Sequence, residues 1–269
     1  MEEIQVEIKQ MNAPEEEELY RTLAVLPDDA LVLLKTGALT QKDVSAALTL
    51  IRHNLAAQNG EGFDLSAQAV EMAKTKTGGA FMKFHRRQSW LYAVLEYMRH
   101  VYVRMDIKDI CAMYNLRRGK PMKVKDFDKA FEELPQTVKA RFVRLADALI
   151  TSEAAEYETI VSHVQSLHSL TLPGMQDIED VHAYGYPHSE PAYRQLLKAF
   201  RNHVSDVKAQ TLMRGAFDRL TIDEDLRAGF DGLVFSLSLE DEDKESLFTH
   251  YEQACKATRR YALRGGKEK

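Results

Sequence analysis

The chain has 269 residues, of which 45% are hydrophobic and 29% charged, a composition typical of a folded protein that excludes an intrinsically disordered one. Glycine (13) and proline (7) are both scarce, which disfavours turn-rich sandwiches and barrels and favours long helices. The formal net charge of −5 is small, and the two cysteines, Cys111 and Cys255, lie far apart and indicate neither a disulfide framework nor a metal-binding pair.

Charge is strongly segregated along the sequence. Residues 74–146 carry 17 Lys and Arg against 7 Asp and Glu, a net charge of +10. Residues 1–73 have a net charge of −8, and residues 147–269 have a net charge of −7. A clustered positive field attracts phosphate groups or an acidic partner, whereas a scattered one only keeps a protein in solution. The central segment is therefore the predicted functional part of the chain.

The first part of the chain predicts short helices. Pro14 followed by four glutamates is typical of a helix start, because proline suits the first turn and acidic side chains complement the helix dipole. Pro27 ends this helix, and Thr40 is expected to cap a later one. The four predicted helices cover residues 14–27, 28–37, 40–60 and 65–74, and Gly78 and Gly79 then break the pattern.

From Phe81 the helical periodicity is longer and sharper. Apolar side chains fall within a narrow arc at about 100° per residue, at Phe84, Leu91, Leu95, Met98 and Tyr102. A helix capped by Asp106 and another over 124–134 are expected next. Pro135 either ends that element or begins a helix that continues to Leu167.

The last third combines one predicted loop with further helices. Residues 171–191 hold three of the seven prolines and two glycines, which is typical of a boundary or long loop. Helices are expected from Pro191 to about Leu220, after Asp223 and after Ser238.

These patterns predict an all-α protein, a multi-helix bundle of about ten helices. The predicted regions are an acidic N-terminal helical region (1–73), a basic central helical region (74–170), a loop or boundary (171–191) and a C-terminal helical region (192–269), which can also pack together as one domain.

The helix expected over 81–104 has a second face that is basic and aromatic, with Lys83, Arg86, Trp90, Tyr97, His100 and Arg104. Basic side chains make salt-dependent contacts with phosphate, and aromatic rings that face outward can stack on exposed bases. The alternative is that Trp90 and Tyr97 pack against another helix while the charged side chains are solvated.

Residues 106–134 predict a helix, a basic turn and a second helix, and resemble a helix-turn-helix unit. The phosphate contacts would come from Arg117, Arg118, Lys120, Lys123 and Lys125, and Arg144, with Lys139 and Arg141, extends the positive field. Two features argue against groove insertion. The connection has about eight residues instead of three or four, and the second helix carries Asp126, Asp128, Glu132 and Glu133. The alternative is a basic loop between bundle helices with solvated charges.

No catalytic or metal-binding motif is present. His182 and His188 lie among carboxylates in the predicted loop, but no spacing places three ligands on one helical face. No phosphate loop, GxSxG motif or catalytic cysteine context occurs. The sequence therefore predicts no enzyme, no metal and no cofactor.

We interpret the chain as a helical, nucleic-acid-associated regulatory protein that contacts the phosphate backbone of DNA or RNA through its basic central surface. The alternative is a protein–protein interaction adaptor whose basic surface binds an acidic partner or a dimer mate, which the pI near 6.0 favours. The start of the chain shows no secretory signal, and no apolar run approaches the roughly 20 residues that span a bilayer. We therefore expect a cytoplasmic protein without a membrane segment; the sequence predicts no oligomeric state.

Overall fold

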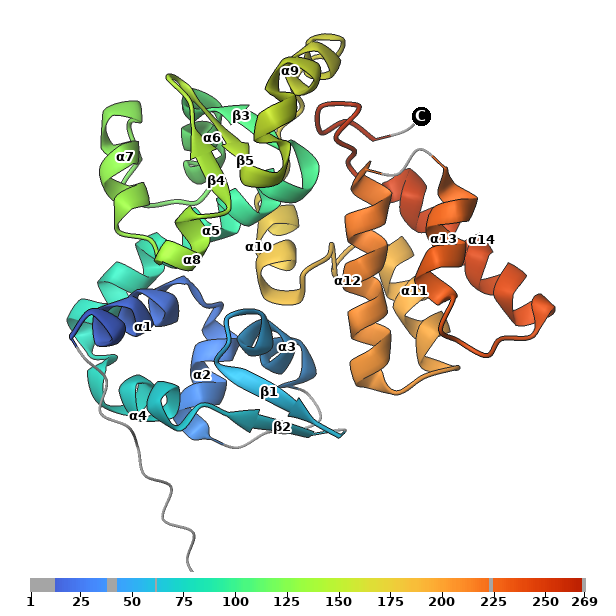
Figure 1. The fold of residues 1–269 in the computed structure, drawn as a ribbon, viewed down its shortest axis with the longest axis horizontal. Helices are drawn as coiled ribbons and strands as arrows, with labels where there is room; N and C mark the ends of the chain where they lie inside the picture. Colours follow the sequence, from blue (N-terminus) through green and yellow to red (C-terminus); the bar gives the residue numbers. More distant parts are fainter. Residues whose placement is uncertain (1–12, 38–42, 61, 223–224, 268–269) are drawn as a thin grey trace, which may run out of the picture.

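The computed structural model describes residues 13–37, 43–60, 62–222 and 225–267. Within these residues the chain forms fourteen α-helices and two small antiparallel sheets (Figure 1). The predicted all-α class is confirmed. Among the helices described, none combines the length and apolar character that crossing a membrane requires.

The N-terminal part contains α1 (Ala13–Val25), α2 (Asp28–Thr36), α3 (Val44–Arg52) and α4 (Ala67–Lys76), with a hairpin of β1 (Ala56–Asn59) and β2 (Gly62–Leu65). The predicted helix over 40–60 is wrong beyond Arg52. Asn54 and Gly60 have positive φ angles of 58° and 61°, which end α3 and form the hairpin turn. The predicted cap Thr40 lies outside the described residues.

The central part contains α5 (Gly79–Val101), β3 (Arg104–Asp106), α6 (Ile107–Tyr114), α7 (Val124–Glu132), α8 (Gln136–Lys139), β4 (Phe142–Arg144), β5 (Ala148–Thr151) and α9 (Glu158–Ser166). A helix continuing from Pro135 to Leu167 is wrong, because this segment forms α8, two strands, a 3-10 helix over Ser152–Tyr157 and α9. β5 is buried throughout and lies between β3 and β4 in an antiparallel sheet. A short apolar run fits a central strand as well as a buried helix.

The C-terminal part contains α10 (Met175–Tyr184), α11 (Pro191–Arg201), α12 (Asp206–Ile222), α13 (Leu226–Val234) and α14 (Asp241–Ala257). The predicted loop over 171–191 is partly wrong, because α10 occupies its middle and buries Ile178 and Val181. The single helix expected from Pro191 to Leu220 is divided into α11 and α12. The predicted cap Asp223 lies outside the described residues, and the carboxylate of Asp225 caps α13 by accepting from the Ala228 N–H at 2.9 Å.

Buried side chains form two clusters. The smaller cluster joins α1–α4 to the start of α5 through Leu23, Leu34, Leu50 and Phe81. The larger cluster runs from the rest of α5 to α14. Because α5 contributes to both clusters, it connects them, and α1, α6, α10 and α12 pack against it. Figure 1 shows it running through the middle of the N-terminal and central parts.

A buried carboxylate reinforces this central position. Glu96 of α5 has no solvent exposure and receives Arg141 at 2.9 Å and Arg52 of α3 at 3.1 Å. Burial by itself raises the pKa of Glu96, but Arg52 and the hydrogen bond with His100 outweigh it and lower the pKa well below its ordinary value. Glu96 therefore stays ionised and connects three parts of the chain.

Candidate functional site

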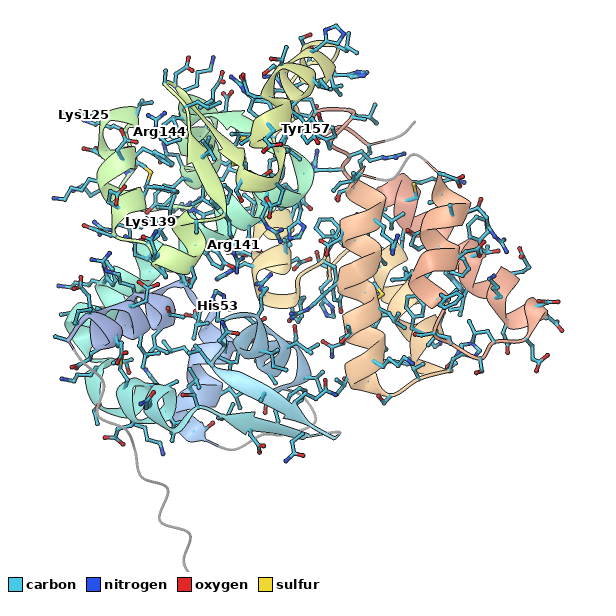
Figure 2. The ribbon with its side chains drawn as sticks, viewed as in Figure 1. His53, Lys125, Lys139, Arg141, Arg144 and Tyr157 are labelled. Atoms are coloured by element: carbon cyan, nitrogen blue, oxygen red, sulfur yellow. The ribbon has the colours of Figure 1, made fainter. Side chains whose placement is uncertain are left out.

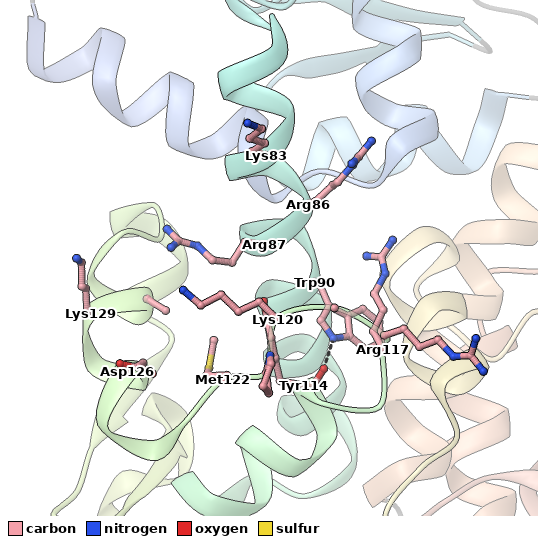
Figure 3. A pocket seen from close by; sticks show the side chains of 14 residues that line it. Lys83, Arg86, Arg87, Trp90, Tyr114, Arg117, Lys120, Met122, Asp126 and Lys129 are labelled. Carbon is pink, nitrogen blue, oxygen red and sulfur yellow. Dashed lines mark hydrogen bonds between the residues drawn. The ribbon is translucent and has the colours of Figure 1, made fainter.

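A pocket of about 920 Å³ lies between α5, the connection over residues 115–123 and α7 (Figure 3). From α5 come Lys83, Arg86 and Arg87, and from the connection come Arg117, Arg118 and Lys120. Lys129 and Asp126 of α7 face them from the opposite side. The pocket thus gathers seven cationic side chains and one carboxylate from three segments.

The local sequence explains how these cations come to one place. Residues three, four and seven positions apart lie on one side of a helix, so Lys83, Arg86, Arg87 and Trp90 share the side of α5 that lines the pocket. The connection is closed by Asn115, whose side-chain amide donates to the Met122 carbonyl at 3.1 Å and accepts from the Met122 N–H at 2.8 Å. These two hydrogen bonds close the loop that carries Arg117 and Arg118.

Trp90 forms part of the pocket floor instead of facing outward. Its side chain is only 3% exposed, and the indole Nε1–H donates to the Tyr114 carbonyl at 2.7 Å (Figure 3). The Arg117 guanidinium lies over the ring, 5.5 Å from its centroid. The prediction of an outward ring that stacks on bases is therefore wrong, and the alternative of packing holds for both Trp90 and Tyr97, which is also buried. The remaining role for Trp90 is to support Arg117.

Most cations of the pocket have no carboxylate as an ion-pair partner among the described residues. Arg87 pairs with Glu133. The other six, all exposed, make no ion pair with any residue in the described part of the chain: Lys83, Arg86, Arg117, Arg118, Lys120 and Lys129. Asp126 is the one carboxylate among the lining residues. The pocket is therefore a concave site with a strong positive field.

The predicted basic surface does not form one continuous face. Arg104 lies on β3, beyond the end of α5, and pairs with Asp106 at 3.3 Å and Glu158 at 3.5 Å. Arg144 of β4 pairs with Asp128 of α7 at 2.9 Å. Figure 2 shows Lys125 on α7 and Arg144 on β4.

Other basic residues nearby are either paired with a carboxylate or lie outside the pocket. Lys139 pairs with Glu132 at 2.8 Å, and Arg141 pairs with the buried Glu96. Lys123 and Lys125 are exposed at the start of α7, but neither lines the pocket. Of the ten predicted contact residues, the structure thus brings together Lys83, Arg86, Trp90, Arg117, Arg118 and Lys120.

The helix pair resembling a helix-turn-helix unit forms, as α6 and α7, but its connection spans residues 115–123. This is longer than the three or four residues of the DNA-reading motif. Three of the four acidic residues at α7 and its end are also paired within the protein, Asp128 with Arg144, Glu132 with Lys139 and Glu133 with Arg87, while Asp126 lines the pocket. The arrangement therefore places a basic loop at a pocket.

Sequence reasoning missed Arg87, Tyr114, Met122 and Lys129 of the pocket lining. Arg87 follows Arg86 and lies four residues after Lys83, so helical spacing alone could have placed it on the same side. Lys129 gave no such signal, because its position depends on how α7 packs against the rest of the fold.

The two histidines of the predicted loop, His182 and His188, make contacts with other side chains of the fold. His182 is buried and its Nε2 lies 2.9 Å from the Ser89 hydroxyl, which itself donates to the Leu26 carbonyl at 2.9 Å. His188 stacks on Tyr184, with ring centroids 4.0 Å apart. Within the described residues no three His, Cys, Asp or Glu side chains converge as a metal site would require.

No protein-family model, curated protein or solved structure matches this chain. The function is therefore inferred from the chemistry of the pocket itself.

Proposed function

We propose that this protein is a nucleic-acid-associated regulatory protein that binds phosphate groups of DNA or RNA in the pocket between α5, residues 115–123 and α7. The observation that carries the proposal is the set of six exposed cations around one pocket that have no carboxylate partner among the described residues. Like charges held together repel one another, and an anionic ligand relieves this repulsion.

The side-chain types favour phosphate as the anion. Arg86, Arg117 and Arg118 carry planar guanidinium groups that match two phosphate oxygens at once, and Lys83, Lys120 and Lys129 add point charges. Because the Trp90 ring is covered, stacking on bases adds little. The expected contact is to phosphate and independent of base sequence.

An acidic protein partner or a dimer mate is the competing occupant, since carboxylates also pair with arginine. The N-terminal residues 1–73, with a net charge of −8, are one source of such carboxylates in a second copy of the chain. Direct measurement separates this adaptor function from nucleic-acid binding.

The test is the affinity for labelled single-stranded and duplex DNA and RNA as the salt concentration is varied. Replacing Arg117 and Arg118 with alanine removes two phosphate contacts. The plot of log affinity against log salt concentration has a negative slope. This slope should become shallower by about 1.4 on single strands and by about 1.8 on duplexes.

Arg144→Ala is the matched control, because Arg144 is an arginine outside the pocket that already pairs with Asp128. It should leave affinity and salt slope unchanged. If the double variant binds every nucleic acid as the unaltered protein does, the pocket is not the interface. Recovery of a nuclease-resistant protein complex through the same arginines would instead support the adaptor function.

A further inference from the structure

The shape of the pocket limits what can occupy it. Its cations come from three segments and line a volume of about 920 Å³, which lies within the roughly 300–1,000 Å³ of small-ligand sites. Beyond it, Arg104, Arg141 and Arg144 are paired with carboxylates. Lys123 and Lys125 are exposed and make no ion pair within the described residues, but they lie outside the pocket lining, so the unpaired positive charge is densest around the pocket itself.

The positive charge around this pocket exceeds the negative charge that one phosphodiester within a strand carries. A phosphodiester within a strand carries one negative charge, whereas a phosphomonoester carries about −1.5 to −2 at pH 7 and presents three strong acceptor oxygens. Six unpaired cations, among them Arg86, Arg117 and Arg118, surround the same space. A terminal phosphate matches this density of positive charge better than a backbone phosphate does.

Three of these cations, Arg117, Arg118 and Lys120, lie on a loop that hydrogen bonds within the protein hold in place before any ligand binds. The hydrogen bonds between Asn115 and Met122 close the connection. The Arg117 guanidinium rests on the indole of Trp90, which is fixed in turn by its bond to the Tyr114 carbonyl. Less side-chain freedom is lost when such a group binds, so affinity for a compact anion rises.

We propose, building on the nucleic-acid function above, that the pocket receives the terminal phosphomonoester of a single-stranded nucleic acid and so recognises a phosphorylated strand end. The end of a single strand can enter the pocket, whereas the terminal phosphate of a blunt duplex stays beside a stacked base pair. Trp90 acts as a positioning residue for Arg117 and does not stack on the ligand.

The experiment compares oligonucleotides of one sequence that end in a 5′-hydroxyl, a 5′-phosphate or a 3′-phosphate, as DNA and as RNA, with the dye on the opposite end. The phosphorylated end should bind about tenfold more tightly than the hydroxyl, as expected for one further charge-assisted hydrogen bond. Comparison of the 5′-phosphate and 3′-phosphate oligonucleotides shows which terminus the protein recognises. The preference should shrink below about pH 6, where the phosphomonoester loses its second charge.

Trp90 supplies an independent readout, because it is the only tryptophan of the chain and its ring contacts Arg117. Phosphorylated ends should change its fluorescence more than hydroxyl ends at equal saturation. Arg117→Ala and Lys120→Ala, both at exposed loop positions, should reduce the preference for phosphorylated ends, while Arg144→Ala should keep it.

Failure of this proposal is distinguishable from failure of the proposed function. If hydroxyl and phosphorylated ends bind equally well and both depend on Arg117, strand-end recognition is wrong while nucleic-acid binding stands. If a nucleoside monophosphate or inorganic phosphate competes as strongly as the phosphorylated strand, the pocket binds a free phosphate compound and end recognition is again wrong. If no nucleic acid binds, both proposals fall.

Discussion

Glu96 illustrates at the scale of one residue how this fold uses charge. Its carboxylate has no exposure, yet it stays ionised because Arg52 and the hydrogen bond with His100 outweigh the effect of burial on its pKa. The guanidinium groups of Arg52 and Arg141 lie 3.1 Å and 2.9 Å from it. A buried ion pair adds little net stability compared with an apolar substitute, but removal of one partner leaves the others without compensation. Glu96 is therefore a position where the loss of a single charge should be costly.

We expect Glu96→Gln to lower the free energy of unfolding by about 3 kcal/mol, which is the lower end of the range for a broken buried pair. The lower end applies because the side chains of Arg52 and Arg141 are 22% and 25% exposed and can regain some hydration. Urea denaturation measures the change. Glu156→Gln, at an exposed glutamate, is the control and should be neutral. A loss below about 1 kcal/mol would contradict the structural role of Glu96.

At the scale of elements, a histidine links α5 to α12. The His100 Nδ1 lies 2.7 Å from an Asp218 carboxylate oxygen, and the ring packs against Phe217. Burial by itself lowers the pKa of His100, but the hydrogen bonds to Asp218 and Glu96 outweigh it and raise the pKa above its ordinary value. Arg99, its neighbour in sequence, partly opposes this shift. The link between the helices is therefore strongest when His100 is protonated.

A group whose pKa is raised by folding adds stability below its unfolded pKa and loses that contribution as pH rises through the folded pKa. For His100 the full contribution is expected below about pH 6.5. Asp218→Asn should therefore destabilise the protein by about 1 kcal/mol at about pH 5.5, a modest value because Asp218 is 57% exposed.

The difference from the unaltered protein should diminish as pH rises through the raised pKa of His100, and urea unfolding at several pH values measures it. Asp147→Asn is the control, because Asp147 is exposed and makes no ion pair within the described residues. An effect of Asp218→Asn that is the same at every pH would show that the proton on His100 is not involved.

At the scale of the whole molecule, Arg214 of α12 connects three parts of the fold. Its guanidinium donates to the Ser45 carbonyl at 3.0 Å and the Thr49 hydroxyl at 3.2 Å on α3, and to the Tyr184 carbonyl at the end of α10 at 2.9 Å. Gly185, with φ of 82°, leaves the space that Arg214 fills, since a Cβ there would lie 2.9 Å from the Arg214 Cγ. The C-terminal helices are thus tied to the N-terminal region.

Arg214→Met keeps an unbranched apolar stem but shortens the side chain and removes its donors, so the carbonyl oxygens of Ser45 and Tyr184 each lose a partner. We expect a loss of about 2 kcal/mol in stability and faster hydrogen exchange in α3 and α12 than in α7. Exchange measured by mass spectrometry resolves these helices. Arg194→Met, at an exposed arginine of α11, should change neither; unchanged exchange in α3 after Arg214→Met would contradict this connection.

The sequence predicted the limits of helices correctly where a proline or glycine marks them. Pro14, Pro27 and Gly37 mark the limits of α1 and α2 as expected, because proline and glycine restrict the backbone at their own positions. One of the two alternatives at Pro135 is a helix that includes residues 148–151, which instead form the central strand of a sheet. An apolar run of this length suits either structure, and the choice depends on the partners β3 and β4.

The sequence by itself determined the helical class and the concentration of positive charge in residues 74–146, since composition and periodicity are properties of the chain. Only the tertiary structure decided which of those charges remain available. Arg141 meets Glu96, 45 positions away, and Arg144 meets Asp128, 16 positions away, whereas Arg117 and Arg118 meet no carboxylate in the described residues. Ion pairing depends on distances in space, so folding neutralised part of the basic segment and left the remainder around one pocket.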